Sequence, residues 1–228
     1  AVIWQGEDGR EETCSYADLD REATSLAAGL RQLGLSQGDV VGFYMPMLAQ
    51  TVAALMACAR LGCITLPLFS GFGADAVAQR LQLGGARAVI TADGTSRRGQ
   101  MVAMKPVVDA ALAGNDSVRH VIVLRHAGIA TKMSAPRDIG WNDLLAATAD
   151  PPPAVELPAE HPVLLMYTSG TTGLPKGTIH THSGMGIKLG QDARLTLDMK
   201  PADRVLWPTD FGWFGGTVTI VGSLLAGA

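Results

Sequence analysis

A short apolar run followed by a loop of small polar residues constrains this chain most strongly. The run Val163-Leu164-Leu165-Met166 is typical of a buried strand. It leads into the segment YTSGTTGLPKG at residues 167–177, which is rich in Gly, Ser and Thr and contains Lys176. Glycines let the backbone curl until its N–H groups converge on an anion, and hydroxyls and a lysine add further donors. The segment therefore predicts a strand that runs into a phosphate-binding loop.

Two other interpretations of this loop must be weighed. Clusters of Gly, Ser and Thr between strands are often plain turns. A turn does not require two glycines three residues apart, four hydroxyls and a Pro-Lys-Gly ending. The Walker A loop has the pattern G-x-x-x-x-G-K-[ST]. Here Pro175 stands where that pattern has its second glycine, and Gly177 stands where it has Ser or Thr. A P-loop kinase or GTPase is therefore excluded.

Before this loop, the chain alternates between helical and strand periodicity. Helical spacing covers residues 17–33, 48–61, 74–84 and 105–113, and buried-strand patterns cover residues 40–45, 63–68, 88–91 and 120–124. Such alternation predicts βαβ units, in which helices cover both faces of a mostly parallel sheet. The apolar strands agree with burial on both faces. The expected fold class is therefore α/β.

A run of three prolines, Pro151-Pro152-Pro153, interrupts this pattern as a stiff break. We expect a first α/β subdomain at residues 1–150 and the start of a second, carrying the phosphate loop, at residues 151–228. After the loop we expect a helix near 184–197 and a strand near 204–207. The uncharged segment 211–228 is long enough to raise the question of a membrane span, but its glycines favour a loop followed by a buried helix.

Composition excludes some classes of partner. The 228 residues carry a net charge of −3, and Lys and Arg are scattered, so neither a nucleic-acid surface nor an anionic-membrane surface is expected. Cys58 and Cys63 lie in apolar surroundings, which favours buried free thiols and a reducing, cytoplasmic setting. His180 and His182 would share one face of a strand, but two ligands are too few for a metal site, and no metal-binding residues are predicted.

The segment YTSGTTGLPKG resembles the phosphate-loop signature of the adenylate-forming enzymes, which include acyl-CoA synthetases, luciferases and peptide-synthetase adenylation domains. The similarity extends over nearly the whole chain and is strongest to the acetyl-CoA synthetase branch. It is carried by GDVVGFYMPMLAQTVAALMACARLGCITLPLFSGF and by DRVLWPTDFGWFGGTVTIVGSLLAGA. The resemblance implies part of a large N-terminal domain that uses ATP, Mg²⁺ and CoA. In such enzymes a small carboxylate attacks the α-phosphate of ATP, which releases pyrophosphate and forms an acyl-adenylate. The thiol of CoA then displaces AMP from this intermediate.

The same resemblance implies roles for individual residues. Arg97 would help to hold the nucleotide end of CoA, although a solvated surface arginine is the alternative. Trp213 would shorten the acyl pocket, and Phe214 and Gly215 would form neighbouring parts of its wall. The alternative for Trp213 is packing in the core. The residues implied for the β- and γ-phosphates of ATP are Thr168, Ser169, Gly170, Thr171, Thr172, Gly173 and Lys176.

The chain departs from the family pattern in three places. Gln100 stands where the family has a second CoA-binding arginine, and Ser70 replaces a glycine in a Phe-Gly-Gly-Phe segment. Residues 216–219, Gly-Thr-Val-Thr, replace Gly-His-Ser-Tyr after Trp213. With the small Gly215 in the wall, we expect an acyl group somewhat larger than acetate. Asp210 is predicted to cap the following helix in preference to orienting a pocket residue.

The later motifs of the family are absent, including the adenine contact, the magnesium-binding glutamate, the ribose-binding aspartate and the C-terminal catalytic lysine. We therefore expect an N-terminal part of a larger enzyme, a short-chain acyl-CoA synthetase, that is inactive alone. Two alternatives stay open: an adenylation domain that loads a carrier protein, and a non-catalytic nucleotide-binding fragment. Nothing in the sequence sets the oligomeric state.

Overall fold

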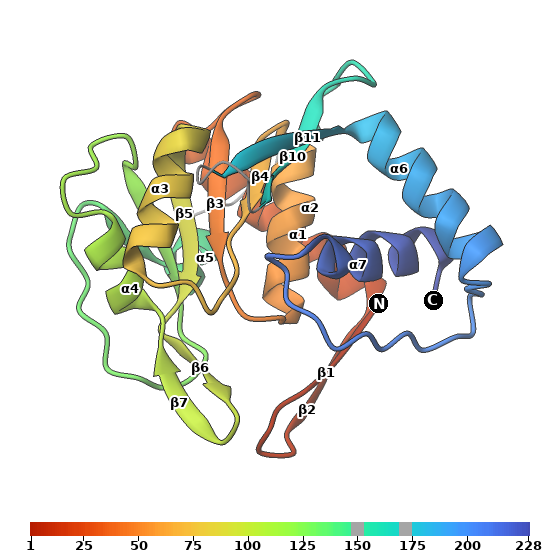
Figure 1. Cartoon of the computed structure of the whole chain (residues 1–228), viewed down its shortest axis with the longest axis horizontal. Helices are drawn as coiled ribbons and strands as arrows, with labels where there is room; N and C mark the ends of the chain where they lie inside the picture. Colours follow the sequence, from red (N-terminus) through yellow and green to blue (C-terminus); the bar gives the residue numbers. More distant parts are fainter. Residues whose placement is uncertain (147–152, 169–174) are drawn as a thin grey trace.

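A computed structural model describes residues 1–146, 153–168 and 175–228 of the chain. Its centre is a seven-stranded sheet with the order β11-β10-β4-β3-β5-β8-β9 (Figure 1). In that order the strands are Lys176–Thr181, Pro162–Thr168, Ile64–Pro67, Val40–Tyr44, Ala86–Ala92, His120–Leu124 and Asp138–Gly140. All neighbours pair in parallel except β10 and β11. The mixed α/β fold with a mostly parallel sheet is confirmed.

The central strands of this sheet are apolar because helices cover both of its faces. All five residues of β3 are buried, as expected for a central parallel strand. The helices form two groups (Figure 1): α1, α2 and α5 pack together, and α3 packs on α4. Their bounds are Tyr16–Gln32, Ala49–Leu61, Trp141–Ala146, Ala74–Gly84 and Lys105–Ala111. Right-handed crossovers in opposite directions from β3 place these groups on opposite faces.

The direction of chain winding reverses at β3, which lies between β4 and β5. In open α/β sheets ligands bind outside the carboxyl ends of the strands at such a switch point. Two hairpins stand at this edge of the sheet, and the sequence did not predict either of them. One joins β1 (Val2–Gln5) to β2 (Glu11–Cys14), and the other joins β6 (Gly94–Arg97) to β7 (Gln100–Ala103). Both have strands of four residues, too short to show a clear period of two.

The C-terminal third contains α6 (His182–Gln191), a π-helical turn η1 (Asp192–Thr196) and α7 (Phe214–Ala226). These confirm the predicted helix near 184–197 and the predicted loop and helix at 211–228. The strand predicted near 204–207 is wrong, since this segment is irregular and Leu206 is 88% exposed. An apolar run forms a strand only where a neighbouring strand offers a hydrogen-bonded edge. Among the described residues, no helix is long and apolar enough to cross a membrane.

Strand β10 lies after the proline run, yet it pairs with β4 of the first part of the chain through Leu164 and Thr65. Both parts therefore contribute to one sheet. The predicted boundary falls on residues 147–152, outside the described residues, so the division into subdomains at residue 150 stays a prediction. The thiols of Cys58 and Cys63 are free and buried, as predicted.

Candidate functional site

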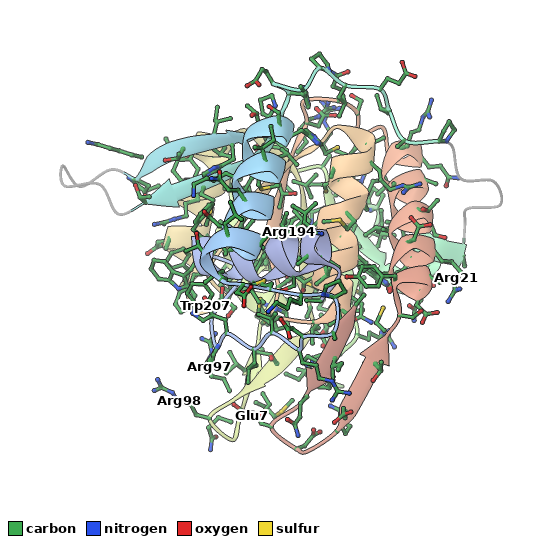
Figure 2. The ribbon with its side chains drawn as sticks, turned by 90° about the vertical axis from the view of Figure 1, so that its right-hand side faces the viewer. Glu7, Arg21, Arg97, Arg98, Arg194 and Trp207 are labelled. Carbon is green, nitrogen blue, oxygen red and sulfur yellow. The ribbon has the colours of Figure 1, made fainter. Side chains whose placement is uncertain are left out.

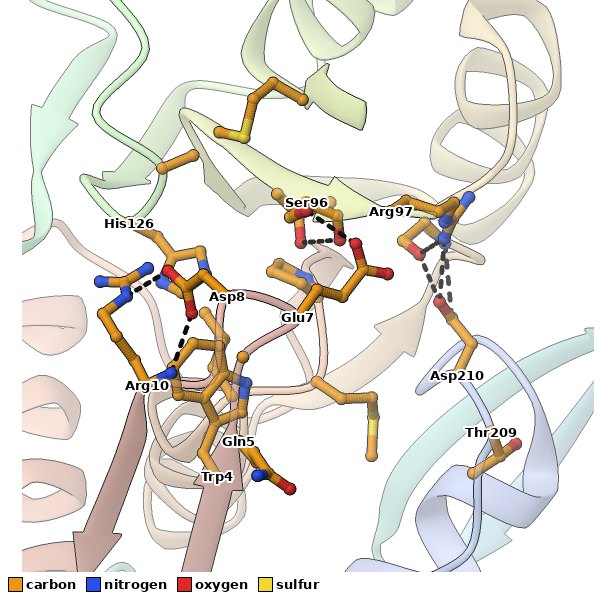
Figure 3. A pocket seen from close by; sticks show the side chains of 18 residues that line it. Trp4, Gln5, Glu7, Asp8, Arg10, Ser96, Arg97, His126, Thr209 and Asp210 are labelled. Atoms are coloured by element: carbon orange, nitrogen blue, oxygen red, sulfur yellow. Dashed lines mark hydrogen bonds and ion pairs between the residues drawn. The ribbon is translucent and has the colours of Figure 1, made fainter. Parts of the chain in front are cut away.

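A cleft of about 440 Å³ opens at the carboxyl edge of the sheet, beside the switch point at β3 (Figure 3). Its walls come from the loops after β3, β4 and β8, from the two hairpins, and from the irregular segment before α7. Residues that represent these walls are Met47, Ser70, Ser96, His126, Glu7 and Thr209. Six separate segments of the chain therefore meet at the place where the fold favours ligand binding.

Arg97 and Asp210 face each other at one end of this cleft. The Arg97 guanidinium lies 3.8 Å from the Asp210 carboxylate. The Ser70 hydroxyl lies between them, accepting a hydrogen bond from Arg97 and donating one to Asp210. The Asp210 carboxylate also accepts the backbone N–H of Gly212 at 2.8 Å. Arg97 is therefore held by Ser70 and Asp210 while part of its side chain stays exposed, and its role at CoA stays a prediction.

Asp210 does not cap α7, contrary to the prediction. The N-cap of α7 is Trp213, and it receives no side-chain hydrogen bond. A capping side chain must accept from an N–H in the first turn of its helix. The Asp210 carboxylate is instead directed at Ser70 and Arg97. From the sequence alone, Ser70 differs from the family only by replacing a glycine. The sequence does not indicate its contact with Asp210, because Asp210 lies 140 residues further along the chain.

The backbone of Ser70 is also held by Tyr44, the last residue of β3. The buried Tyr44 hydroxyl lies 3.1 Å from the carbonyl of Ser70 and 2.9 Å from that of Phe72, close enough to donate to either. Burial raises the pKa of the Tyr44 phenol, so the group stays a donor at neutral pH. The loop after β4 is thus held to the end of β3, and the Ser70 backbone is fixed against the core of the sheet.

Asp93 fixes another wall of the cleft. This carboxylate is 1% exposed and accepts four backbone N–H groups, those of Gly94, His126, Ala127 and Ile129, at 2.8 to 3.0 Å. Burial opposes its ionisation, but the hydrogen bonds together outweigh burial and lower the pKa of Asp93. Asp93 therefore ties the loop after β8 to the start of β6, the strand that carries Arg97.

Trp213 and Phe214 lie where the segment before α7 passes the loop after β4. The Trp213 ring lies 5.6 Å from that of Phe69, and Trp213 is 56% exposed, so the alternative of core packing is wrong. The Phe214 ring stacks on His180 of β11 at 5.0 Å. His182 begins α6 and does not share a strand face with His180, contrary to the expectation. The chain leaves the strand at Thr181, which caps α6 through the N–H of Gly184.

Glycines allow this segment to approach its neighbours closely. A Cβ atom on Gly212 would lie 2.3 Å from the Cα of Phe69, so only glycine fits there. Gly215 is less constrained, since an added Cβ would lie 3.4 Å from Thr209 Oγ1 and 3.6 Å from the Trp207 ring. Trp213, Phe214 and Gly215 are therefore brought together by a segment that is itself fixed against the loop after β4.

The strand predicted before the phosphate loop is part of β10, and β11 returns beside it as an antiparallel partner. Thr168 and Lys176 form the last pair of this hairpin, and the Thr168 hydroxyl lies 3.4 Å from the Lys176 carbonyl. The loop residues Ser169, Gly170, Thr171, Thr172 and Gly173 lie outside the described residues. Of the seven residues expected at the ATP phosphates, the structure therefore places Thr168 and Lys176, at the base of the loop.

In the described parts of the chain, no group of three or more His, Cys, Asp or Glu side chains is arranged to hold a metal ion. The cleft offers donors that suit a phosphate, namely the Arg97 guanidinium and the hydroxyls of Thr95 and Ser96. The carboxylates of Glu7, Asp8 and Asp210 lie in the same walls. The cleft is therefore of mixed charge, with Arg97 and Asp210 at one end and Arg10 and Asp8 at the other (Figure 3).

Comparison with known proteins places this geometry in a family. The family model described as "AMP-binding enzyme" matches residues 1–228. The acetyl-coenzyme A synthetases of Chlorobaculum tepidum and Streptomyces avermitilis are 39% and 40% identical over 100% and 95% of the chain. The chain spans 35% and 33% of these relatives, about a third of their length.

A solved structure agrees with these relatives. The acetoacetyl-CoA synthetase from Streptomyces lividans superposes on 99% of the chain with a TM-score of 0.90 and 32% sequence identity. The matched part is 34% of that protein. The fold of the chain thus recurs in an acyl-CoA synthetase, as the phosphate-loop motif predicted. This chain therefore belongs to the AMP-binding enzyme family.

Proposed function

We propose that this chain is part of an ATP-dependent acyl-CoA synthetase, an AMP-forming acid–thiol ligase that acts on a short-chain carboxylate. One observation supports this proposal most. The ordered Arg97–Ser70–Asp210 group lies in a cleft at the switch point, and Asp210 is three residues before Trp213. One continuous segment thus joins the proposed CoA end to the proposed acyl end. The relatives named acetyl- and acetoacetyl-CoA synthetase support the same activity.

We propose that ATP binds at the β10–β11 hairpin through Thr168, Ser169, Gly170, Thr171, Thr172, Gly173 and Lys176. ATP would supply the adenylyl group that activates the carboxylate. Lys176 is exposed at the base of the loop, where its ammonium can approach an incoming phosphate. We assign no magnesium ligands, since the described residues do not form a group that fits this ion.

For CoA, the proposed contact is Arg97. The Arg97 side chain is 37% exposed. It can therefore face a ligand in the cleft while Ser70 and Asp210 keep the guanidinium in position. A guanidinium fixed in this way binds a phosphate with less loss of side-chain entropy than a free one. Gln100, the neighbour of Arg97 across the β6–β7 turn, adds no positive charge. We therefore propose that the nucleotide end of CoA binds more weakly here than in a site with two arginines.

The acyl group is proposed to lie against Trp213, Phe214 and Gly215. Because Gly215 leaves room for one additional carbon atom in its wall, we propose an acid somewhat larger than acetate. The test is acyl-CoA formation by the complete gene product with acetate, propionate, butyrate and acetoacetate. A higher kcat/KM for one of the larger acids supports the proposal. Strict preference for acetate contradicts it.

The activity itself is tested with the complete gene product that contains this chain. Carboxylate-dependent release of AMP with CoA as the acceptor is expected. Transfer to a carrier protein, with no transfer to CoA, would instead identify a carrier-loading adenylation domain. Absence of AMP release with every acid and acceptor would favour a non-catalytic, nucleotide-binding role.

For the 228-residue chain alone, we propose that carboxylate-dependent ATP–pyrophosphate exchange is absent, and robust exchange would contradict this. A cytoplasmic location is proposed from the buried free thiols of Cys58 and Cys63, since reduced cysteines are typical of that compartment. Cell fractionation with an antibody to the chain checks the location.

A further inference from the structure

A small hollow lies at the amino edge of the sheet, on the opposite side from the cleft. Its volume is about 100 Å³, and its walls come from the end of α1 and from the starts of β5 and β8. Figure 2 shows α1 running from near Arg21 away from the end of the molecule at which Arg97 and Arg98 lie. The hollow is therefore separate from the proposed ATP, CoA and acyl sites. Its lining residues are Leu33, Gly34, Leu35, Arg87, Arg119 and His120.

Both walls of this amino-edge hollow are held by backbone hydrogen bonds. After α1, the N–H of Gly34 donates to the Arg31 carbonyl at 2.9 Å, and the N–H of Leu35 donates to the Leu30 carbonyl at 3.1 Å. Gly34 has a φ of 82°, the left-handed conformation with which many helices end. The other wall is the parallel pair of β5 and β8. The side chains around the hollow are therefore carried by ordered elements.

The lining is positively charged, since it contains two arginines and no carboxylate. The N–H of Arg119 donates to the Arg87 carbonyl at 2.8 Å. The two residues are thus neighbours on adjacent strands, where like charges repel. One Arg87 nitrogen lies 2.8 Å from the Asp39 carboxylate. The Arg119 side chain is exposed, and the described parts of the chain give it no hydrogen bond or ion pair.

This positive charge is only partly balanced within the chain. Asp39 offsets the charge of Arg87, and the end of α1 contributes about half a unit of negative charge through the helix dipole. Stabilising that helix end is an alternative role for Arg119, but it requires no hollow between two guanidiniums. Two guanidiniums on either side of a hollow form a donor set that suits the oxygens of a phosphate.

The half-buried ring of His120 lies beside these arginines. Burial is the largest cause that lowers the pKa of His120, the backbone carbonyl of Leu33 raises it, and the charges of Arg119 and Arg87 lower it further. An anion between the arginines would offset their charges and raise the pKa of His120. The ring therefore reports whether an anion occupies the hollow.

We propose that the amino-edge hollow binds a small oxyanion of the phosphate class through the guanidiniums of Arg87 and Arg119. Its volume of about 100 Å³ exceeds what one water molecule needs. It is small beside the pockets of roughly 300–1,000 Å³ that hold drug-sized ligands, so the ligand is a small ion and not a nucleotide. A bound ion would stabilise the joint between α1 and the sheet, since it binds only the folded chain.

The test compares Arg119→Gln with a matched control, Arg31→Gln, in the complete gene product that contains this chain. Both variants lose one exposed arginine near the end of α1, but Arg31 does not line the hollow. Each protein is titrated with inorganic phosphate at constant ionic strength, and the NMR signals of the His120 ring are followed. Phosphate is expected to shift these signals in the wild type and to raise the pKa of His120.

Arg119→Gln should raise the phosphate concentration at half-saturation about tenfold or more, because a hydrogen bond between two charged groups is lost. Arg31→Gln should raise it less than about threefold, since only a screened charge is removed. Arg119→Lys keeps the charge without the planar fork and should weaken binding less than Arg119→Gln does. Circular dichroism checks that each variant is folded.

A titration with pyrophosphate distinguishes two sources of the ion. Tighter binding than phosphate identifies pyrophosphate, which the proposed ligase reaction releases, and equal or weaker binding identifies inorganic phosphate. The proposal is overturned if phosphate leaves the His120 signals unchanged in the wild type. It is also overturned if Arg119→Gln and Arg31→Gln weaken binding equally, because general charge would then explain the effect. Either failure leaves the proposed ligase activity standing, since the hollow shares no residue with the cleft.

Discussion

Arg97 and Asp210 lie 3.8 Å apart across the hydroxyl of Ser70, and this contact joins three segments far apart in the sequence. Arg97 ends β6, Ser70 lies after β4, and Asp210 lies before α7. The Asp210 side chain is only 14% exposed, so its charge depends on these donors more than a surface carboxylate does. The contact therefore fixes the position of the segment that carries Trp213 relative to the cleft.

Replacing Asp210 tests how much this contact contributes to folding. Asp210→Asn keeps the size of the side chain but removes the charge that Arg97 and Ser70 face. The free energy of unfolding in urea is expected to fall by about 1–2 kcal/mol, because charge-assisted hydrogen bonds are weakened. The control is Asp198→Asn, whose side chain is 79% exposed beside Lys200, with an expected change within about 0.5 kcal/mol. Equal changes in the two variants would contradict the structural role of Asp210.

A pair of glycine substitutions tests the close approach of two loops. Gly212→Ala places a Cβ atom 2.3 Å from the backbone of Phe69, and is expected to destabilise the protein by about 1–3 kcal/mol or more. Gly186→Ala, in α6, meets no atom within 4 Å and should stabilise by up to about 1 kcal/mol through helix propensity. Urea unfolding measures both. A neutral Gly212→Ala would show that the two loops are further apart.

A buried ion-pair network near β9 should contribute strongly to stability. The Lys105 side chain is 1% exposed, and its Nζ atom lies 2.7 Å from carboxylate oxygens of both Asp109 and Asp138. Lys105→Met leaves Asp138 buried with Arg137 as its remaining cation, so a loss of about 3 kcal/mol is expected. In the control, Lys188→Met removes the exposed pair with Asp192 and should cost less than about 1 kcal/mol. Comparable losses would argue against the burial of Lys105.

The start of α1 should show a defined pH response. Hydrogen bonds from the Ser15 hydroxyl, Arg21 and the Ser15 backbone lower the pKa of Asp18 to about 2, against 3.8 in the unfolded chain. A lowered folded pKa stabilises the fold above pH 3.8, and this stabilisation is lost as the pH falls towards 2. Ser15→Ala should raise the pKa of Asp18 towards 3.8. Carboxyl NMR titration measures this value, and a wild-type Asp18 that titrates near 3.8 would contradict the capping box.

Hydrophobic periodicity predicted most of the central sheet, because strands buried on both faces and the helices between them have distinct patterns. It predicted β3, β4, β5, β8 and β10, and it predicted α1 to α4 within a few residues. It failed for the four short strands of the hairpins, which carry little periodicity. It also assigned a strand to residues 204–207, where the apolar side chains are exposed. Whether such a run pairs depends on a neighbouring edge, which local sequence does not encode.

For the site, the sequence by itself determined the phosphate-loop motif and the family, since a contiguous motif needs no tertiary information. It also singled out Arg97 and Trp213. Only the tertiary structure decided that Arg97 is held by Ser70 and Asp210, and that Glu7 accepts the N–H groups of the turn beside it. These partners are 27 to 140 residues apart in the chain, and their side chains meet because the winding of the sheet reverses at β3. The sequence determines which chemical groups are present, and the fold determines the distances between them.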